Sequence, residues 1–137
     1  MLEGLLEYER AGRKSAAVTK ACKRAENYLL ERRMFHSLRT GEVIEERWLR
    51  FSFPTFWHYD VLRGLDYLRN AGVKPDSRVR EAIETVIARR HQNGRWPLNF
   101  LYGERIPLEM ETTVGSASRW NTLRALRVLR WYNNSTW

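Results

Sequence analysis

The sequence predicts an all-α protein built from about two and a half helical hairpins. Apolar residues recur at helical spacing in five segments, and no segment shows the strict alternation of a half-buried strand. A pattern of about sixty residues occurs twice and is preceded by a fragment of a third copy. Repeated helical hairpins stack into an array in which each unit buries the apolar face of its neighbour.

The five expected helices follow one another over about residues 2–11, 15–34, 56–71, 76–90 and 118–132. Gly12 ends the first helix and Gly72 the third, because glycine adopts the left-handed conformation of a C-terminal cap at little cost. Ser15 and Asp76 begin the second and fourth helices as N-caps. The third helix is expected to begin after Pro54-Thr55.

Two of these helices carry apolar stripes that we expect to face the core. The stripe of the third helix is Trp57, Val61, Leu65 and Leu68, and that of the fifth is Trp120, Leu123, Leu126 and Leu129. The two long connections, residues 35–54 and 91–117, exceed ~15 residues, and loops of that length in a compact domain are usually functional or ordered. Each contains an Arg-Trp pair, at Arg47-Trp48 and Arg95-Trp96.

The repeat is visible at three offsets that agree within a few residues. Residues 62–69 match residues 123–130 in the pattern L-R-small-L-x-x-L-R, with five identities in eight and an offset of 61. Residues 29–33 match residues 86–90 at an offset of 57, and residues 7–12 resemble residues 66–72 at an offset of 59. We therefore expect one domain over residues 1–137, with units at about 13–72 and 73–132 after a partial unit at 1–12.

The composition is that of a soluble globular chain, with 43% hydrophobic and 29% charged residues. Cys22 is the only cysteine, which excludes a disulfide framework and a thiolate metal cluster. No apolar run approaches the ~20 residues that cross a bilayer. The first residues contain Glu3, Glu7 and Glu9 and lack the layout of a signal peptide, so a cytoplasmic protein is expected.

The chain is basic, with 24 Lys and Arg against 16 Asp and Glu and a net charge of +8. This charge attracts polyanions. The arginines are spread along the chain and alternate with glutamates, as in Arg78-Val79-Arg80-Glu81, whereas nucleic-acid binders concentrate them in a tract or stripe. A solvated surface that prefers anions is therefore favoured over a nucleic-acid interface, which remains an alternative.

The Gly94-Arg95-Trp96 loop resembles the repeat of terpenoid cyclases and of protein prenyltransferase β subunits, the α/α toroid. In that family a Q-x-x-G-x-W turn ends the outer helix of each hairpin. Here His91 occupies the glutamine position and Gln92 stands one place late, so either side chain is expected to bind the helix end. The resemblance implies that Trp96 folds back on the end of its own hairpin in a structural role, and the same is expected of Trp48.

Two longer runs, residues 53–68 and 118–132, resemble an uncharacterised bacterial family of squalene-cyclase-like proteins. Members of that family are about twice as long, and this chain is similar to their C-terminal half. The resemblance covers nearly the whole chain and implies a partial α/α toroid.

The catalytic motifs of the superfamily are not in the sequence. Class II cyclases use D-x-D-D and class I enzymes use D-D-x-x-D, whereas the aspartates here are the widely spaced Asp60, Asp66 and Asp76. The Asp-x-Cys zinc pair of the prenyltransferases is missing, because Lys20 stands two places before Cys22. No catalytic residue and no cofactor are therefore assigned.

A zinc site built on histidine needs three ligands from His36, His58 and His91 together with a carboxylate. These histidines are scattered over two loops and a helix start. No metal site is therefore assigned.

The starts of the third and fifth helices are the candidate ligand site. The offset of 61 aligns Asp60 with Asn121 and His58 with Arg119. In a toroid the inner helices line a cavity, and helix N-termini offer free N–H groups to anions. The candidate residues are His58, Tyr59, Asp60, Arg63, Arg119, Asn121 and Arg124.

The expected ligand of this site carries a diphosphate or carboxylate head on an apolar tail, as in an isoprenoid or another anionic amphiphile. The alternative is structural. In that interpretation Asp60 and Asn121 only cap their helices, and the arginines pair with Glu109 or Glu111.

These observations favour a non-catalytic binding or assembly module. One alternative is half of a terpenoid-cyclase-like enzyme, completed by another chain or by a missing N-terminal half, and a second is a basic nucleic-acid-binding helical domain. An open array leaves apolar side chains at both ends without neighbours. We therefore expect a homodimer, with the first helix and the region of Trp131 near the interface and Trp137 close by.

Overall fold

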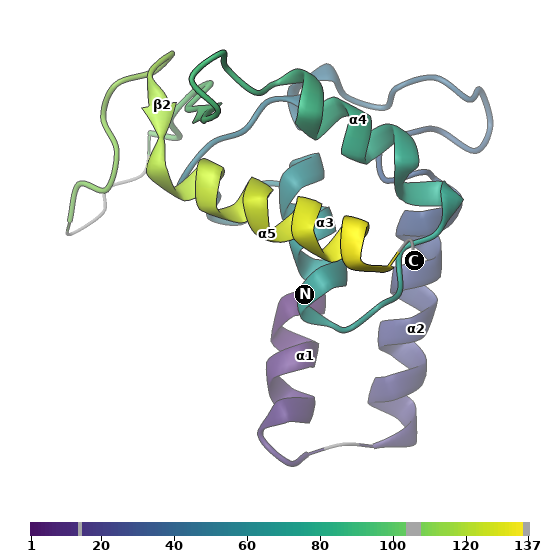
Figure 1. Cartoon of the computed structure of the whole chain (residues 1–137). Helices are drawn as coiled ribbons and strands as arrows, with labels where there is room; N and C mark the ends of the chain where they lie inside the picture. The colour runs from purple at the N-terminus through teal and green to yellow at the C-terminus, as the bar shows by residue number, and fades with distance from the viewer. Residues whose placement is uncertain (14, 104–107, 136–137) are drawn as a thin grey trace.

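The computed structural model describes residues 1–13, 15–103 and 108–135, and this part of the chain is mostly helical (Figure 1). The α-helices are α1 (Leu2–Arg10), α2 (Ala16–Glu31), α3 (Val61–Asn70), α4 (Arg80–Ala88) and α5 (Arg119–Ser135). Two short 3-10 helices, η1 (Glu46–Leu49) and η2 (Ser77–Val79), lie in the connections. The predicted all-α class is confirmed at this level, while Trp137 falls outside the described residues.

A small sheet is the exception to the predicted class. The strands β1 (Trp96–Pro97) and β2 (Ala117–Ser118) pair antiparallel, with Trp96 opposite Ser118. The prediction of no strand was wrong here, because two-residue strands are too short to leave an alternating pattern. The pairing fastens the start of the second long connection to the start of α5.

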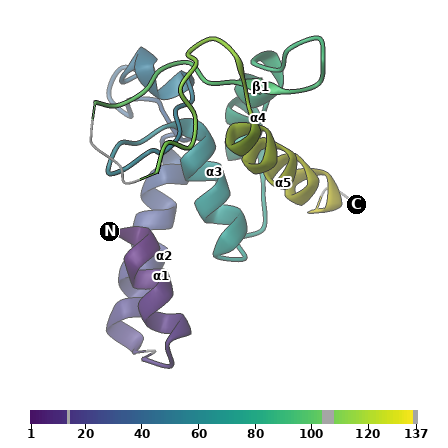
Figure 2. The same ribbon diagram turned by 90° about the vertical axis from the view of Figure 1, so that its left-hand side faces the viewer.

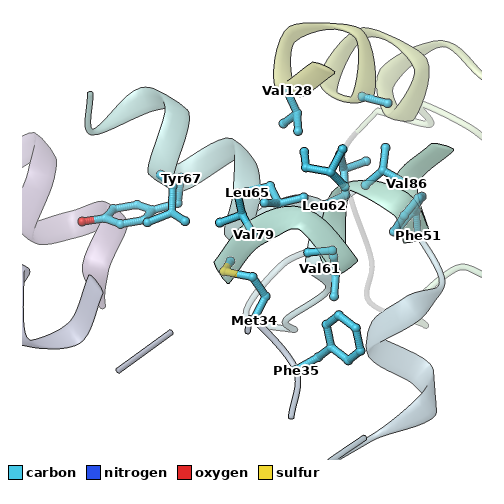
Figure 3. Close-up of a cluster of buried hydrophobic side chains, with 14 of the residues drawn as sticks. Met34, Phe35, Phe51, Val61, Leu62, Leu65, Tyr67, Val79, Val86 and Val128 are labelled. Atoms are coloured by element: carbon cyan, nitrogen blue, oxygen red, sulfur yellow. The ribbon is translucent and has the colours of Figure 1, made fainter. Parts of the chain in front are cut away.

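The hairpin of α1 and α2 projects from the rest of the molecule in both views (Figures 1 and 2). The other three helices form the main body, in which α3 packs against α4 and α5. Leu62 and Leu65 of α3 lie between Val128 of α5 and the Met34–Phe35 segment (Figure 3). Helix α3 is therefore the centre of the core.

Helix α3 begins at Val61, five residues later than predicted. Asp60 has extended backbone angles, and its carboxylate accepts a hydrogen bond from the Arg63 N–H at 2.7 Å. This N-cap fixes the helix start more strongly than Pro54 does. As a result Trp57 lies before the helix with 74% of its surface exposed, and its predicted place in the core was wrong.

Helix α5 faces the core with a side that differs in part from the one predicted: of the predicted stripe, Leu129 packs against the core cluster. Its buried residues are Asn121, Ala125 and Val128, whereas Leu123 and Leu126 are 40% and 49% exposed. Residues spaced by three drift around a helix of 3.6 residues per turn, so an i, i+3, i+6 series does not stay on one face. The buried residues have i, i+4, i+7 spacing and define the inner face, so Leu123 and Leu126 lie on the outer side.

The repeat-related helices α1, α3 and α5 contact one another in sequence order. Arg10 of α1 donates to the backbone oxygen of Asn70 at 2.6 Å, and Glu3 binds Arg63. Both pairs are separated by 60 positions, so α1 and α3 run in the same direction. At the other side of α3, the Trp131 indole of α5 donates to the Val73 oxygen at 2.9 Å.

Candidate functional site

A groove lies between α1, α2 and the segment that precedes α3. It has a volume of about 370 Å³. Its lining is mainly apolar or aromatic and includes Leu2, Ala25, Tyr28, Leu29, Trp57, His58 and Tyr59. The rings of Tyr28 and Trp57 are 55% and 74% exposed, so the groove is bordered by aromatic surface that water still reaches.

A second hollow of about 760 Å³ continues from this groove along α1 and α2. The two hollows share Met1, Ala25 and Tyr28. Three basic side chains and one acidic side chain line the second hollow, namely Lys20, Lys23, Arg24 and Glu31. The apolar groove therefore opens into a region of net positive charge.

Tyr59 and Gly64 form part of the groove wall. The Tyr59 hydroxyl donates to the backbone oxygen of Met34 at 2.8 Å, and burial raises the pKa of this phenol, which keeps it neutral. Gly64 is required beneath the ring, because a Cβ atom there would lie 2.6 Å from the Tyr59 oxygen and 2.8 Å from Met34 Cε. This wall offers no charge to a ligand.

Arg63 is held by internal partners. Its Nε and Nη2 atoms donate to the two carboxylate oxygens of Glu3 at 2.9 and 2.6 Å. Its Nη1 atom donates to the backbone oxygens of His58, at 2.8 Å, and of Phe56. The bond from Arg63 holds the pKa of Glu3 below its ordinary value. Arg63 thus connects α1 to the segment that precedes α3, and Glu3 neutralises its charge.

His58 belongs to a series of aromatic rings beside the groove. Its imidazole stacks on Tyr102 with 3.5 Å between ring centroids and 3° between planes. Trp57 lies 5.2 Å from His58 on the same segment. This stacking positions the backbone between Phe56 and Tyr59, where Arg63 is also bound.

Three other predicted site residues, Asp60, Asn121 and Arg124, are buried between α3 and α5. Arg124 Nη2 lies 3.8 Å from Asp60 Oδ1, and Arg124 Nη1 donates to Asn121 Oδ1 at 3.2 Å. The Asn121 amide donates to the Pro97 oxygen at 3.1 Å. Burial raises the pKa of Asp60, and the nearby Arg124 opposes that shift. These side chains connect elements of the fold.

The start of α5 is capped differently from the predicted pattern. Ser118 Oγ accepts from the Asn121 N–H at 2.9 Å, so the N-cap is Ser118 and not Asn121. A Glu111 carboxylate oxygen accepts from the backbone N–H of Arg119 at 2.7 Å. In the structural alternative Asp60 caps its helix, which is confirmed, and the arginines pair with Glu109 or Glu111, whereas Arg63 and Arg124 pair with acids of α1 and α3.

The seven predicted ligand residues therefore lie in three separate places in the structure. His58, Tyr59 and Arg63 line the apolar groove. Arg119 lies by a separate small hollow, and the remaining three are in the core. The sequence interpretation missed the contribution of α2, whose signal was the series Ala21, Ala25 and Tyr28 at helical spacing beside Lys20 and Arg24.

The Arg-Trp motif closes a hairpin as predicted. Trp96 is fully buried, and its indole donates to the Val86 oxygen near the end of α4 at 2.6 Å. Among the described residues, neither the His91 ring nor the Gln92 amide forms a hydrogen bond. Arg90 takes the place expected for them, since its Nε donates to the Gly94 oxygen at 3.2 Å.

Trp48, the second tryptophan of the motif, is half-buried. It packs against the core and meets the ring of Tyr59 edge-on at 5.0 Å. Its contact with Tyr59 supports the groove wall, in keeping with the structural role predicted for it.

The three histidines do not converge. His36 bridges the Gly41 oxygen and the Glu81 carboxylate, each at 2.9 Å. Within residues 1–13, 15–103 and 108–135, no three His, Cys, Asp or Glu side chains are placed to hold a metal ion. The helices of this part of the chain are also too short or too polar to span a bilayer.

No protein-family model, curated protein or solved structure matches this chain. The assignment to the α/α toroid superfamily therefore has no support from these comparisons and stays a prediction from the sequence.

Proposed function

We propose that this chain is a partial α/α toroid that acts as a non-catalytic binding module for an apolar ligand with an anionic head group. The observation that carries the proposal is the apolar groove between α1, α2 and residues 56–59, which opens toward Lys20 and Arg24. Ligand sites are typically concave and mainly apolar, with a few polar groups that fix orientation.

The apolar part of the ligand would lie against Leu29, Tyr59 and the edge of Trp57. Burial of apolar surface contributes about 25 cal/mol per Å². The anionic head would reach Lys20 and Arg24, which line the adjoining hollow. Arg63 is less suited to this role, because Glu3 already binds it through two hydrogen bonds.

The toroid assignment is supported by three features of the chain. Trp96 closes the turn after α4, as the family motif requires. The repeat-related helices α1, α3 and α5 adjoin one another in sequence order. The arginines at equivalent positions, Arg63 and Arg124, each bind an acid on the preceding helix of this row.

The enzyme alternative has less support in the described residues. Asp60 and Asp66 both lie beside Arg124, so neither is a free acid for catalysis. The nucleic-acid alternative is tested by salt. Binding driven by phosphate contacts should fall by orders of magnitude between about 50 and 200 mM salt, whereas binding in an apolar groove should change little.

The test of the proposal is calorimetric titration with dodecyl phosphate below its critical micelle concentration. Ala25 lines both hollows, so Ala25→Trp should fill them and weaken binding at least tenfold. The matched control is Ala88→Trp at an exposed position at the end of α4, which should bind as the parent does.

The contribution of the head group is tested separately. The double variant Lys20→Ala/Arg24→Ala should bind dodecyl phosphate more weakly than the parent and bind dodecanol with parental affinity. The double variant Arg80→Ala/Arg95→Ala changes two exposed arginines elsewhere and is the charge-matched control. The proposal is overturned if the parent does not bind dodecyl phosphate, or if Ala25→Trp binds it with parental affinity.

A further inference from the structure

We infer that the outward face of α5 docks helix α1 of a second copy of this chain, so that the row of repeat-related helices continues from one copy into the next. This face consists of Leu123, Leu126, Arg127 and Arg130, all of which are exposed. The inference depends on the surfaces of α5 and α1 and is independent of the ligand groove.

The first observation concerns two pairs of equivalent leucines. Leu123 and Leu126 correspond to Leu62 and Leu65 at the repeat offset of 61. The leucines of α3 are 0% exposed, because α4 and α5 cover them, while those of α5 are 40% and 49% exposed. In the described part of the chain, no following repeat covers α5. The face that is core in one repeat is therefore left open in the next.

The second observation is the charge of this face. Helix α5 contains four arginines and no acidic residue. Asp66 of α3 lies 4.0 Å from Arg124 of α5, but its repeat equivalent in α5 is Arg127, which is exposed. The negative charge of Asp66 in α3 is thus replaced by the positive charge of Arg127 at the equivalent position of α5. A neighbour of α5 has to be acidic, and a second α5 is repelled.

Helix α1 has the complementary charge. It contains three glutamates and one basic residue, Arg10. One of them, Glu3, already accepts two hydrogen bonds from Arg63 of α3, a repeat-related helix. Glu7 pairs with Arg10 of its own helix at 2.8 Å, and both of these side chains are exposed, so Glu7 can exchange this partner for an arginine of a neighbouring chain. Complementary potentials of this kind fix the partner and the register of an interface.

The free side of α1 also suits close packing. Gly4 and Glu7 are exposed, and Tyr8 is 44% exposed. A Cβ atom added at Gly4 would have no atom within 4 Å, so a neighbouring helix has room to approach. Tyr8 and Gly4 would then meet Leu123 and Leu126, and Glu7 would meet Arg127. Trp131 is not needed in the interface, because its indole binds Val73 within the chain.

The resulting contact is head-to-tail, and such contacts either close into a ring or continue as an open filament. Light scattering after size-exclusion chromatography measures the mass of the protein in solution, which is compared with the 16.4 kDa of one chain. The parent should exceed this mass at tens of micromolar. Leu126→Glu should return it to one chain, and the control Ile87→Glu, at a residue 52% exposed on α4, should not.

Charge reversal tests the register. Arg127→Glu and Glu7→Arg should each raise the dissociation constant at least tenfold, and the two together should restore it. Parental association of Leu126→Glu, or dissociation of Ile87→Glu, would place the interface elsewhere. A parent with the mass of one chain overturns the inference outright.

Cross-linking distinguishes the head-to-tail contact from contact between two copies of α5. In a Cys22→Ser background, chains with Tyr8→Cys are mixed with chains with Leu126→Cys and oxidised. A disulfide-linked dimer is expected from the mixture and not from Leu126→Cys alone. Equal cross-linking of Leu126→Cys by itself would put α5 against α5 and reject α1 as the occupant.

Discussion

Arg124 of α5 reaches back to Asp60, the residue that caps α3, with 3.8 Å between Nη2 and Oδ1. Both side chains are almost completely buried, at 11% and 4% exposed. Arg63 has the equivalent position one repeat earlier and binds Glu3 of α1. The repeated arginine therefore fastens each helix of the row to the one before it, and its two copies differ mainly in burial.

Replacing Arg124 with Gln should strongly destabilise the fold. The substitution removes the larger of the two arginine charges that act on the buried Asp60 carboxylate and leaves it the weaker influence of Arg63 and its backbone N–H bonds, so the loss should lie at or below the about 3–5 kcal/mol of a broken buried pair. Urea unfolding followed by circular dichroism measures the loss. Asp60→Asn should cost much less, because an asparagine still caps α3, and it should recover most of the loss when it is combined with Arg124→Gln.

The pH dependence of Arg124→Gln checks the cause. Burial raises the pKa of Asp60, so the folded state holds this proton more tightly than the unfolded state does. The free-energy cost of burying the ionised Asp60 is absent below its pKa in the unfolded chain, and it grows as pH rises through its pKa in the folded protein. The variant should therefore gain stability relative to the parent on acidification, and a constant difference across that range would contradict this account.

Glu3 should show the opposite sign. The bond from Arg63 holds the pKa of Glu3 below its ordinary value of 4.5, so the pair contributes stability above pH 4.5 that is lost as pH falls through the lower folded pKa. The Glu3 side chain is 51% exposed, which limits the contribution to about 1 kcal/mol or less.

The corresponding experiment compares Glu3→Gln with the parent in urea at several pH values. The difference should be largest at neutral pH and should disappear in acid. Glu84→Gln, at an exposed position of α4, is the matched control and should differ little from the parent at any pH. A loss that persists in acid would show that Glu3 acts through packing.

Gly64→Ala should destabilise the protein although alanine is the better helix former. The added Cβ would lie 2.6 Å from the Tyr59 oxygen, whose position is fixed by its bond to Met34. Overpacking of this kind costs about 1–3 kcal/mol. Gly4→Ala in α1 is the control, because no atom lies within 4 Å of the new Cβ, and it should stabilise by up to about 1 kcal/mol. A Tyr59→Phe background should relieve part of the Gly64→Ala penalty, measured by urea midpoints.

Local signals predicted the helices and three of their caps. Ser15, Asp60 and Asp76 each accept the backbone N–H bond that an N-cap requires, although Asp60 is a cap only in the structural alternative and lies inside the predicted third helix. Trp96 was expected to close its hairpin and does so. Such features depend on residues within about ten positions of each other, which a sequence pattern contains directly.

The candidate site was less predictable because its contacts join distant segments. The partner of Arg63 is Glu3, 60 positions away, and both lie beside a groove whose other wall comes from α2. In α5 two helical series compete, and the buried one is Asn121, Ala125 and Val128, whose polar and small members make it the weaker apolar signal beside the exposed Leu123 and Leu126. A repeat indicates which helices are equivalent, but not which face of the last helix is left without a neighbour.

Trp96 gives the most direct test of the hairpin motif. Its ring is fully buried and its indole donates to the Val86 oxygen at 2.6 Å, so Trp96→Ala should cost about 3–5 kcal/mol through lost contacts and a cavity. Trp96→Phe keeps most of the ring and removes the indole donor, while the Val86 oxygen keeps the longer bond from the Arg89 N–H at 3.3 Å, so the cost should be about 1 kcal/mol. Trp57→Ala is the control. Trp57 is 74% exposed, so the free energy of unfolding of Trp57→Ala, measured in urea, should stay within about 0.5 kcal/mol of the parent value. If Trp57→Ala lowered stability as much as Trp96→Ala does, the segment before α3 would be part of the core, and the groove described here would be closed.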